Sequence, residues 1–321
     1  MAGEHRPSPH PDPPRGPARR RGGHGSLGGS VTSARRTIGA LVHELAGTLD
    51  PGMGAGARRE ARDIVAALLD VARLWPIGHA DDGADDALVA RAREAVERRR
   101  RGMPLAYAVG RAAFRQLTLD VDERVLIPRP ETELLVDLVL AATRGRGGLA
   151  IDVGTGSGAL ALALASEGQF DRVIGTDVSS DALHVAAANA RRLVPDIGRR
   201  VEFRQGSYLA PVEGLSARAV VSNPPYISYA EALSLPASVR GWEPAVALLA
   251  GDDGLAATTA IVAGAAAILE PGGVLALEAD SRRAATAAAL VAADGRYGDI
   301  AVRPDLTGRD RFIVAIRRTR S

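Results

Sequence analysis

A glycine-rich loop between an apolar run and a helical pattern constrains this chain more than any other feature. The apolar run covers residues 149–153, the loop reads Asp152-Val-Gly-Thr-Gly-Ser-Gly158, and a helical pattern follows over 157–165. Glycine lets the backbone turn tightly and approach a ligand closely, and the free N–H groups that open a helix attract a carboxylate or phosphate. The arrangement therefore predicts a strand, a ligand-binding loop and a helix, which is the opening unit of an α/β fold.

Strand-like and helix-like patterns alternate along the rest of the chain. Such alternation predicts a mostly parallel sheet with helices on both faces. The last two strand-like runs have no helix between them, so we expect a terminal hairpin in which one strand is antiparallel. The predicted strands cover 149–153, 173–177, 201–205, 219–222, 274–278, 300–303 and 312–316, and the predicted helices cover 157–165, 181–192, 255–269 and 284–292.

The chain before the glycine loop shows three other patterns. Apolar residues at helical spacing predict a small helical bundle. Strand-like runs over 114–121 and 125–127, with a turn near 122–123, predict a β-hairpin connector. The first residues are rich in proline, glycine and arginine and poor in large apolar side chains, which predicts disorder. We therefore divide the chain into a disordered tail (1–32), an N-terminal helical domain (33–102), a hairpin linker (103–130) and an α/β domain (131–321).

Two absent residue types narrow the possible chemistry. The chain has no cysteine, which excludes disulfides, thiolate metal sites and cysteine nucleophiles. All 40 basic residues are arginine, so no Schiff-base or P-loop lysine is available. The histidines lie far apart or in the tail, so we expect no metal site. Without a long apolar run or an apolar leader, we expect a cytoplasmic protein that contacts no membrane.

A second motif, Asn223-Pro-Pro-Tyr226, follows the predicted strand at 219–222. Ligands of parallel sheets bind at the carboxyl ends of the strands beside the switch in strand order, so we expect this motif to face residues 154–158. The prolines stiffen the bend, and the Asn223 side-chain oxygen and the Pro224 carbonyl can accept both hydrogens of a planar NH₂ group. Tyr226 offers a flat face to stack on that group. This predicts alignment of an amide or exocyclic amine as the nucleophile, without proton abstraction by a tuned base.

An acidic residue completes the sequence signals for a bound nucleoside. Asp177 ends the predicted strand at 173–177, the first strand after the glycine loop. A carboxylate in that position can accept hydrogen bonds from ribose hydroxyls, as it does in nucleotide-binding α/β sheets. The loop and the acid together predict a ligand that contains adenosine.

With these motifs in place, the chain resembles the release factor glutamine methyltransferase (HemK/PrmC) family of class I S-adenosylmethionine-dependent methyltransferases. The resemblance covers about residues 35–321. It implies a Rossmann-like class I methyltransferase sheet and S-adenosyl-L-methionine as cofactor. It also implies methyl transfer to the side-chain N5 of the glutamine in the Gly-Gly-Gln motif of class I peptide-chain release factors, which the helical domain and the hairpin would dock. It rests on segments 102–110, 125–133, 152–158, 223–226, 242–248, 271–273 and 308–311.

The resemblance also implies roles for single residues. Asn223 would contact both cofactor and substrate, and Ser207 and the segment Glu278-Ala-Asp280…Arg283 depart from the family pattern. The implied catalytic residues are Asn223, Pro224 and Tyr226; the cofactor-binding residues are Gly154, Thr155, Gly156, Ser157, Gly158, Asp177, Tyr208 and Asn223; and the substrate-binding residues are Asn223, Pro224, Pro225 and Tyr226.

Three alternatives stay open on the sequence. The acceptor can be another protein glutamine, such as one in a ribosomal protein. It can also be the N6 amine of adenine in a nucleic acid, because that amine is planar too. A formal net charge of +2 and an aromatic content of 3% disfavour nucleic-acid binding, which we do not expect. The third alternative is a catalytically silent module that binds the cofactor or the release factor, against which the intact motif at 223–226 argues.

Overall fold

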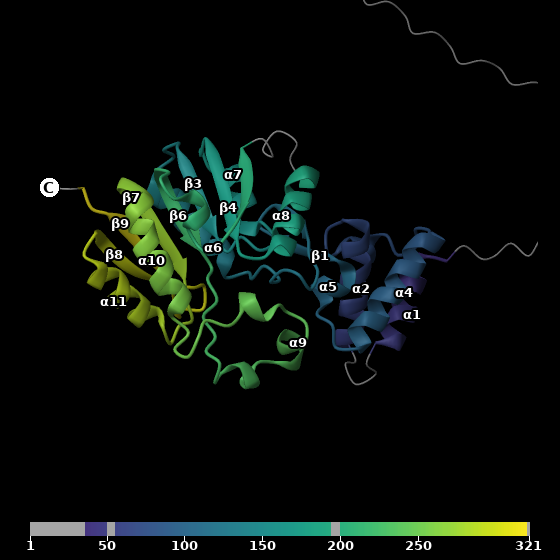
Figure 1. Ribbon diagram of the computed structural model, residues 1–321. Helices are drawn as coiled ribbons and strands as arrows, with labels where there is room; N and C mark the ends of the chain where they lie inside the picture. Colours follow the sequence, from purple (N-terminus) through teal and green to yellow (C-terminus); the bar gives the residue numbers. More distant parts are fainter. Residues whose placement is uncertain (1–35, 50–54, 194–199, 320–321) are drawn as a thin grey trace, which may run out of the picture. The chain divides into compact units, whose positions relative to one another are not determined.

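A seven-stranded sheet carries the glycine loop and the Asn-Pro-Pro-Tyr corner (residues 223–226) in the computed structural model, which describes residues 36–49, 55–193 and 200–319 (Figure 1). The predicted tail at 1–32 lies outside these residues. The strand order among the described residues is β5-β4-β3-β6-β7-β9-β8. The strands are β3 (Leu149–Val153), β4 (Arg172–Asp177), β5 (Val201–Gln205), β6 (Ala217–Ser222), β7 (Leu269–Glu278), β8 (Tyr297–Pro304) and β9 (Asp310–Arg317).

The pairing of these strands confirms the predicted topology. Strands β3 to β7 pair in parallel, whereas β9 runs antiparallel to both β7 and β8. The order reverses at β3, which lies between β4 and β6. Val153 pairs with Ser222 across β3 and β6, so the next residues, Gly154 and Asn223, leave the sheet beside each other. The switch in strand order thus brings the two motifs together, as the sequence predicted.

Helices cover both faces of the sheet, and the alternation of side chains along each strand builds two cores. Ala150 and Val221 are buried in one core with residues of α6, α7 and α8, whereas the neighbouring Ile151 and Val220 are buried in the other core with residues of α10 and α11. Figure 1 shows these helices beside the sheet. The predicted helices are confirmed, and α6, which the sequence patterns missed, is added. The five helices are α6 (Thr132–Thr143), α7 (Ala159–Glu167), α8 (Ser180–Leu193), α10 (Ala256–Ile268) and α11 (Ala284–Asp294).

The helical bundle expected before the sheet is present and has its own core. Ile38, Leu41 and Leu45 of α1 are buried with Ile64 of α2 and Val89 of α4. Every helix within the described ranges is too short or too polar to cross a lipid bilayer. The helices of this region are α1 (Ile38–Thr48), α2 (Ala55–Leu69), α3 (Trp75–Gly78), α4 (Asp86–Arg100) and α5 (Leu105–Val109).

The β-hairpin connector is present, but its predicted turn is wrong. Strands β1 (Arg111–Phe114) and β2 (Leu117–Asp120) pair around a turn at 115–116, and residues 125–127 form no strand. Arg115 adopts a left-handed conformation with φ of 53°. Its guanidinium donates to Glu167 and Asp137, on α7 and α6, at 2.6–2.8 Å. These ionic contacts from distant segments hold the turn in a place that local strand patterns cannot reveal.

Candidate active site

A cavity of about 280 Å³ lies at the carboxyl ends of β3, β4 and β6. We call it the first cavity. A second cavity of about 150 Å³ shares Asn223, Pro224 and Pro225 with it. The Asn-Pro-Pro-Tyr corner therefore lies between two adjoining spaces, and the glycine loop borders only the first. The predicted site residues that line the first cavity are Gly154, Gly156, Asp177, Tyr208, Asn223, Pro224 and Pro225, and Tyr226 lines the second.

The glycine loop bends through backbone angles that favour glycine. Gly154, Gly156 and Gly158 have φ values of 73°, 54° and 85°, in the left-handed region. A Cβ atom at Gly154 or Gly156 would meet nothing within 4 Å, so space is open beside the loop there. The N–H groups of Gly154 and Thr155 donate to the Thr176 carbonyl at 2.8 and 2.9 Å. These contacts fix the loop against β4 and leave Gly154 and Gly156 on the wall of the first cavity, whereas Gly158 packs against Ala186 and Leu162 and does not line it.

Two loop residues predicted to bind cofactor turn their side chains into the protein. Thr155 is 5% exposed and donates its hydroxyl to Asp152 Oδ2 at 2.7 Å, and the same oxygen accepts from the Ala161 N–H at 3.1 Å. Burial raises the pKa of the Asp152 carboxyl to about 7. Ser157 is 3% exposed, and its carbonyl accepts from Asn189 Nδ2 at 3.0 Å. Neither residue lines the first cavity: the Thr155 hydroxyl supports the loop through Asp152, and Ser157 supports it through its backbone carbonyl.

Asp177 and Tyr208 occupy the far side of the first cavity. Asp177 accepts the Gly156 N–H at 3.0 Å on Oδ2 and the Ser179 N–H at 2.9 Å on Oδ1. Tyr208 has φ of 49°, and its carbonyl accepts from the Thr176 hydroxyl at 2.7 Å. This leaves Tyr208 40% exposed on the cavity wall. A carboxylate and an open aromatic face match the hydroxyls and the flat base of a nucleoside.

Thr132 and Glu278, which the sequence did not single out as site residues, orient the Asn223 side chain. Asn223 Nδ2 donates to Thr132 Oγ1 at 3.1 Å, and Thr132 donates to Glu278 Oε2 at 2.7 Å. Within the described ranges, neither Asn223 Oδ1 nor the Pro224 carbonyl accepts a hydrogen bond. Burial raises the pKa of the Glu278 carboxyl to about 7. The two oxygens that the sequence predicts as acceptors are thus without a donor among the described residues.

Tyr226 is half-buried beside this corner and stays a neutral phenol. Burial, followed by the nearby Glu278 carboxylate, raises the pKa of its hydroxyl to about 12. Tyr226 thus brings an aromatic residue with a neutral hydroxyl to the lining of the second cavity.

A partly buried ion pair joins the linker to a segment that lines the second cavity. Arg129 donates to both carboxylate oxygens of Glu243 at 2.7 and 2.8 Å, and the Glu243 side chain is 1% exposed. Both residues fall in segments that carried the family resemblance. The two residues lie 114 positions apart in the sequence, so no local sequence pattern could have predicted their contact.

The reversed strand order, the antiparallel strand β9 and the glycine loop at the switch point define a class I methyltransferase. Family models agree: the methyltransferase small domain matches residues 130–235, and the PrmC N-terminal domain matches residues 44–110. The release factor glutamine methyltransferase of Moorella thermoacetica is 40% identical over 285 residues, covering 88% of this chain and 98% of that protein. That of Deinococcus radiodurans is 43% identical over 240 residues, covering 71% and 80%. The chain therefore belongs to the release factor glutamine methyltransferase family.

Solved structures share the fold at much lower sequence identity. The hMettl16 catalytic domain, crystallised in complex with MAT2A 3'UTR hairpin 6, matches with a TM-score of 0.53 and 14% identity. The match covers 74% of this chain and 83% of that one. At this identity the likeness concerns the fold alone.

Proposed function

We propose that this protein transfers a methyl group from S-adenosyl-L-methionine to the side-chain N5 of the glutamine in the Gly-Gly-Gln motif of class I peptide-chain release factors. The observation that carries the proposal is the pair of adjoining cavities that share Asn223, Pro224 and Pro225. One cavity has the groups for a nucleoside, and it adjoins the other at the residues that would supply the two acceptor oxygens. Membership in the release factor glutamine methyltransferase family supports the acceptor.

The residues around the first cavity fit the cofactor. The open backbone at Gly154 and Gly156 leaves room for its methionine part, Asp177 offers a carboxylate to its ribose, and Tyr208 offers a face to its adenine. Ser207, also on the cavity wall, brings a neutral hydroxyl to the adenine side. When bound, S-adenosyl-L-methionine supplies an electrophilic methyl group on a positively charged sulfur.

The corner would align and activate the acceptor amide. Asn223 Oδ1 and the Pro224 carbonyl accept its two N–H hydrogens, which raises the electron density on nitrogen and fixes the direction of its lone pair. Tyr226 stacks on the amide plane. Thr132 holds the Asn223 amide so that Oδ1, and not Nδ2, faces the substrate. Pro225 keeps the bend rigid.

The proposal extends to the rest of the chain. The helical domain (33–102) and the hairpin linker (103–130) would dock the body of the release factor, and the domain from 131 would carry the reaction. Since release factors act on ribosomes, we place this reaction in the cytoplasm.

Transfer of tritium from labelled S-adenosyl-L-methionine to a purified class I release factor tests the proposal. We expect one methyl group per release factor, on the glutamine of the Gly-Gly-Gln peptide, and none on a release factor in which that glutamine is alanine. Persistent labelling of the alanine variant would reject the acceptor. Parallel incubations with ribosomal proteins, DNA and RNA test the alternatives, and label on any of them in preference to the release factor would overturn the proposal.

A further inference from the structure

Residues 228–253 form a loop that leaves the sheet after the Asn-Pro-Pro-Tyr corner and returns beside it. The loop closes where Ile227 donates to the Leu248 carbonyl at 2.9 Å and Tyr229 donates to the Gly251 carbonyl at 3.1 Å. We call this closure the neck. Beyond it, the loop has only short helical turns, including α9 (Ala237–Arg240). The position of the loop therefore depends on how firmly its neck is held.

The loop forms walls of both cavities. Val246 and Leu249 line the first cavity, Leu235 and Val239 line the second, and Ala247 lines both. Since the second cavity takes most of its remaining wall from the corner itself, a displaced loop would open the second cavity more than the first.

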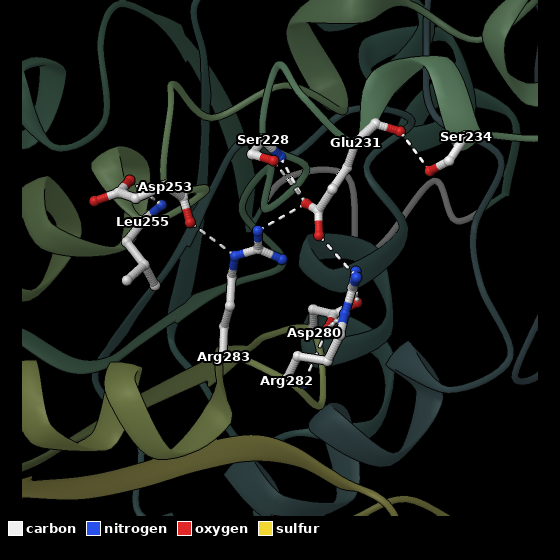
Figure 2. A network of polar contacts seen from close by, with 8 residues as sticks. All are labelled: Ser228, Glu231, Ser234, Asp253, Leu255, Asp280, Arg282 and Arg283. Carbon is white, nitrogen blue, oxygen red and sulfur yellow. Dashed lines mark hydrogen bonds and ion pairs between the residues drawn. The ribbon is translucent and has the colours of Figure 1, made fainter.

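Arg283 joins the two chain segments at the neck, the outgoing limb (228–231) and the returning limb (248–253) of the loop (Figure 2). Its Nη2 donates to Glu231 Oε2 at 2.7 Å, on the outgoing limb, and its Nε donates to the Asp253 carbonyl at 2.8 Å, on the returning limb. Glu231 Oε2 also accepts from the N–H and the hydroxyl of Ser228 at 3.0 and 2.9 Å. The hydrogen bonds from Arg283 and Ser228 lower the pKa of the Glu231 carboxyl to about 2, so it stays charged at any working pH.

The residue that follows the loop, Gly254, packs directly against the corner and Arg283. Gly254 has φ of 73°, and a Cβ atom there would lie 2.5 Å from the Tyr226 carbonyl oxygen and 2.7 Å from Arg283 Nε. The Arg283 side chain is 14% exposed. By contrast, Arg282 forms an ion pair with the other oxygen of the Glu231 carboxylate at 2.8 Å but is 62% exposed and also paired with Asp280 (Figure 2). Of these two arginines, only Arg283 spans both limbs.

We propose that Arg283 and Glu231 are positioning residues that fasten the neck and so hold the wall of the second cavity against which the acceptor peptide binds. The acceptor part of this inference rests on the proposed function, but the fastening itself does not. Loosening the neck would weaken binding of the protein substrate and leave cofactor binding nearly unchanged, because Gly154, Asp177 and Tyr208 lie on other segments.

Limited trypsin digestion of the full chain tests whether Arg283 and Glu231 hold the loop in place, and it needs no measurement of methyl transfer. Trypsin cleaves after lysine or arginine, the chain has no lysine, and Arg240 is the one arginine within 228–253. Mass spectrometry can follow cleavage after Arg240 in the wild type, Arg283→Met and Glu231→Gln, with Arg282→Gln as the matched control. We expect cleavage about tenfold faster in the first two variants, the effect of losing a hydrogen bond to a charged group, and no change in the control. Unchanged cleavage in Arg283→Met would overturn the inference.

Steady-state kinetics and cofactor titration measure the consequence for the substrate. In Arg283→Met we expect KM for the release factor to rise about tenfold and the cofactor Kd to stay within about twofold, because a displaced loop opens the second cavity more than the first. Arg283→Lys keeps the charge but loses the planar guanidinium that donates to both segments, so its KM should fall between those of the wild type and Arg283→Met. Equal weakening of cofactor and substrate, or an unchanged KM, would overturn the inference. If the wild type does not methylate release factors, the proposed function fails, while the digestion still decides whether Arg283 fastens the neck.

Discussion

The glycine loop and the Asn-Pro-Pro-Tyr corner border the same cavity, yet they are held in different ways. The loop is held mainly by backbone groups and by partners that lie within residues 152–189, such as the Thr176 carbonyl and Asn189. The corner is held by side chains from far along the chain: Asn223 contacts Thr132, 91 positions away, and Thr132 contacts Glu278, 146 positions away. The two halves of the site therefore depend on different parts of the sequence.

Because of this difference, we expect substitutions in the loop and substitutions around the corner to affect different properties of the protein. Changes to backbone geometry in the loop should act on the cofactor, because the loop presents backbone to the first cavity. Changes to buried polar side chains should act on the acceptor, because they orient Asn223. Substitutions that move both properties together would show that the two regions are not independent.

Asn223→Ala removes the acceptor oxygen itself and should have the largest effect. We expect single-turnover transfer to slow by about 10²–10³-fold, the scale found when one polar transition-state contact is removed, while cofactor affinity survives. Rapid-quench measurements with labelled cofactor give the rate of transfer, and calorimetric titration gives the cofactor affinity. Ser234→Ala is the control, because among the described residues the Ser234 hydroxyl hydrogen-bonds only to the Glu231 carbonyl in the same loop. A variant that still turned over at the wild-type rate would exclude Asn223 from the chemistry.

Thr132→Val keeps the shape of the side chain but removes the hydroxyl between Asn223 and Glu278. The Asn223 amide can then rotate, and the buried Glu278 carboxyl loses a hydrogen bond, so we expect transfer to slow by about 10–100-fold at saturating cofactor. Thr132→Ser restores the hydroxyl and should recover most of the rate. Equal rates for the valine and serine variants would show that the hydroxyl has no positioning role.

Gly156→Ala tests the loop with a small backbone strain. A left-handed φ of 54° costs an L-residue about 1–2 kcal/mol, so we expect cofactor affinity to fall up to about tenfold as the loop relaxes away from Asp177. Gly214→Ala is a matched control, since Gly214 has φ of 79° and equally open space but lies outside both cavities. Both variants should lose similar thermal stability, and only Gly156→Ala should bind cofactor more weakly. Parallel losses of affinity would assign the effect to global destabilisation.

The same contrast explains which features the sequence could predict. The strand, loop and helix at 149–167 follow from local periodicity and glycine, because backbone conformation is set by near neighbours. The placement of 223–226 opposite the loop follows from the rule for parallel sheets. The roles of Thr132 and Arg283 depend on contacts that form only after the sheet assembles, and the turn at Arg115 depends on carboxylates of two distant helices. Long-range polar contacts carry no periodic signal, so the supports of the corner emerged only from the structure.

The Glu278 carboxyl gives the smallest predicted effect, a pH dependence of stability. Its ordinary pKa is 4.5, and burial raises the value to about 7 in the folded protein. Between these values the folded protein keeps a proton that the unfolded chain releases, so this group makes stability fall as pH rises from about 4.5 to about 7. Glu278→Gln is neutral throughout, so its Tm relative to wild type should increase by a few degrees across this window and level off above it. The buried Asp152 titrates in both proteins and cancels in the difference. A Tm difference independent of pH would mean that Glu278 is ionised when folded, and Thr132 would then orient Asn223 from a permanently charged partner.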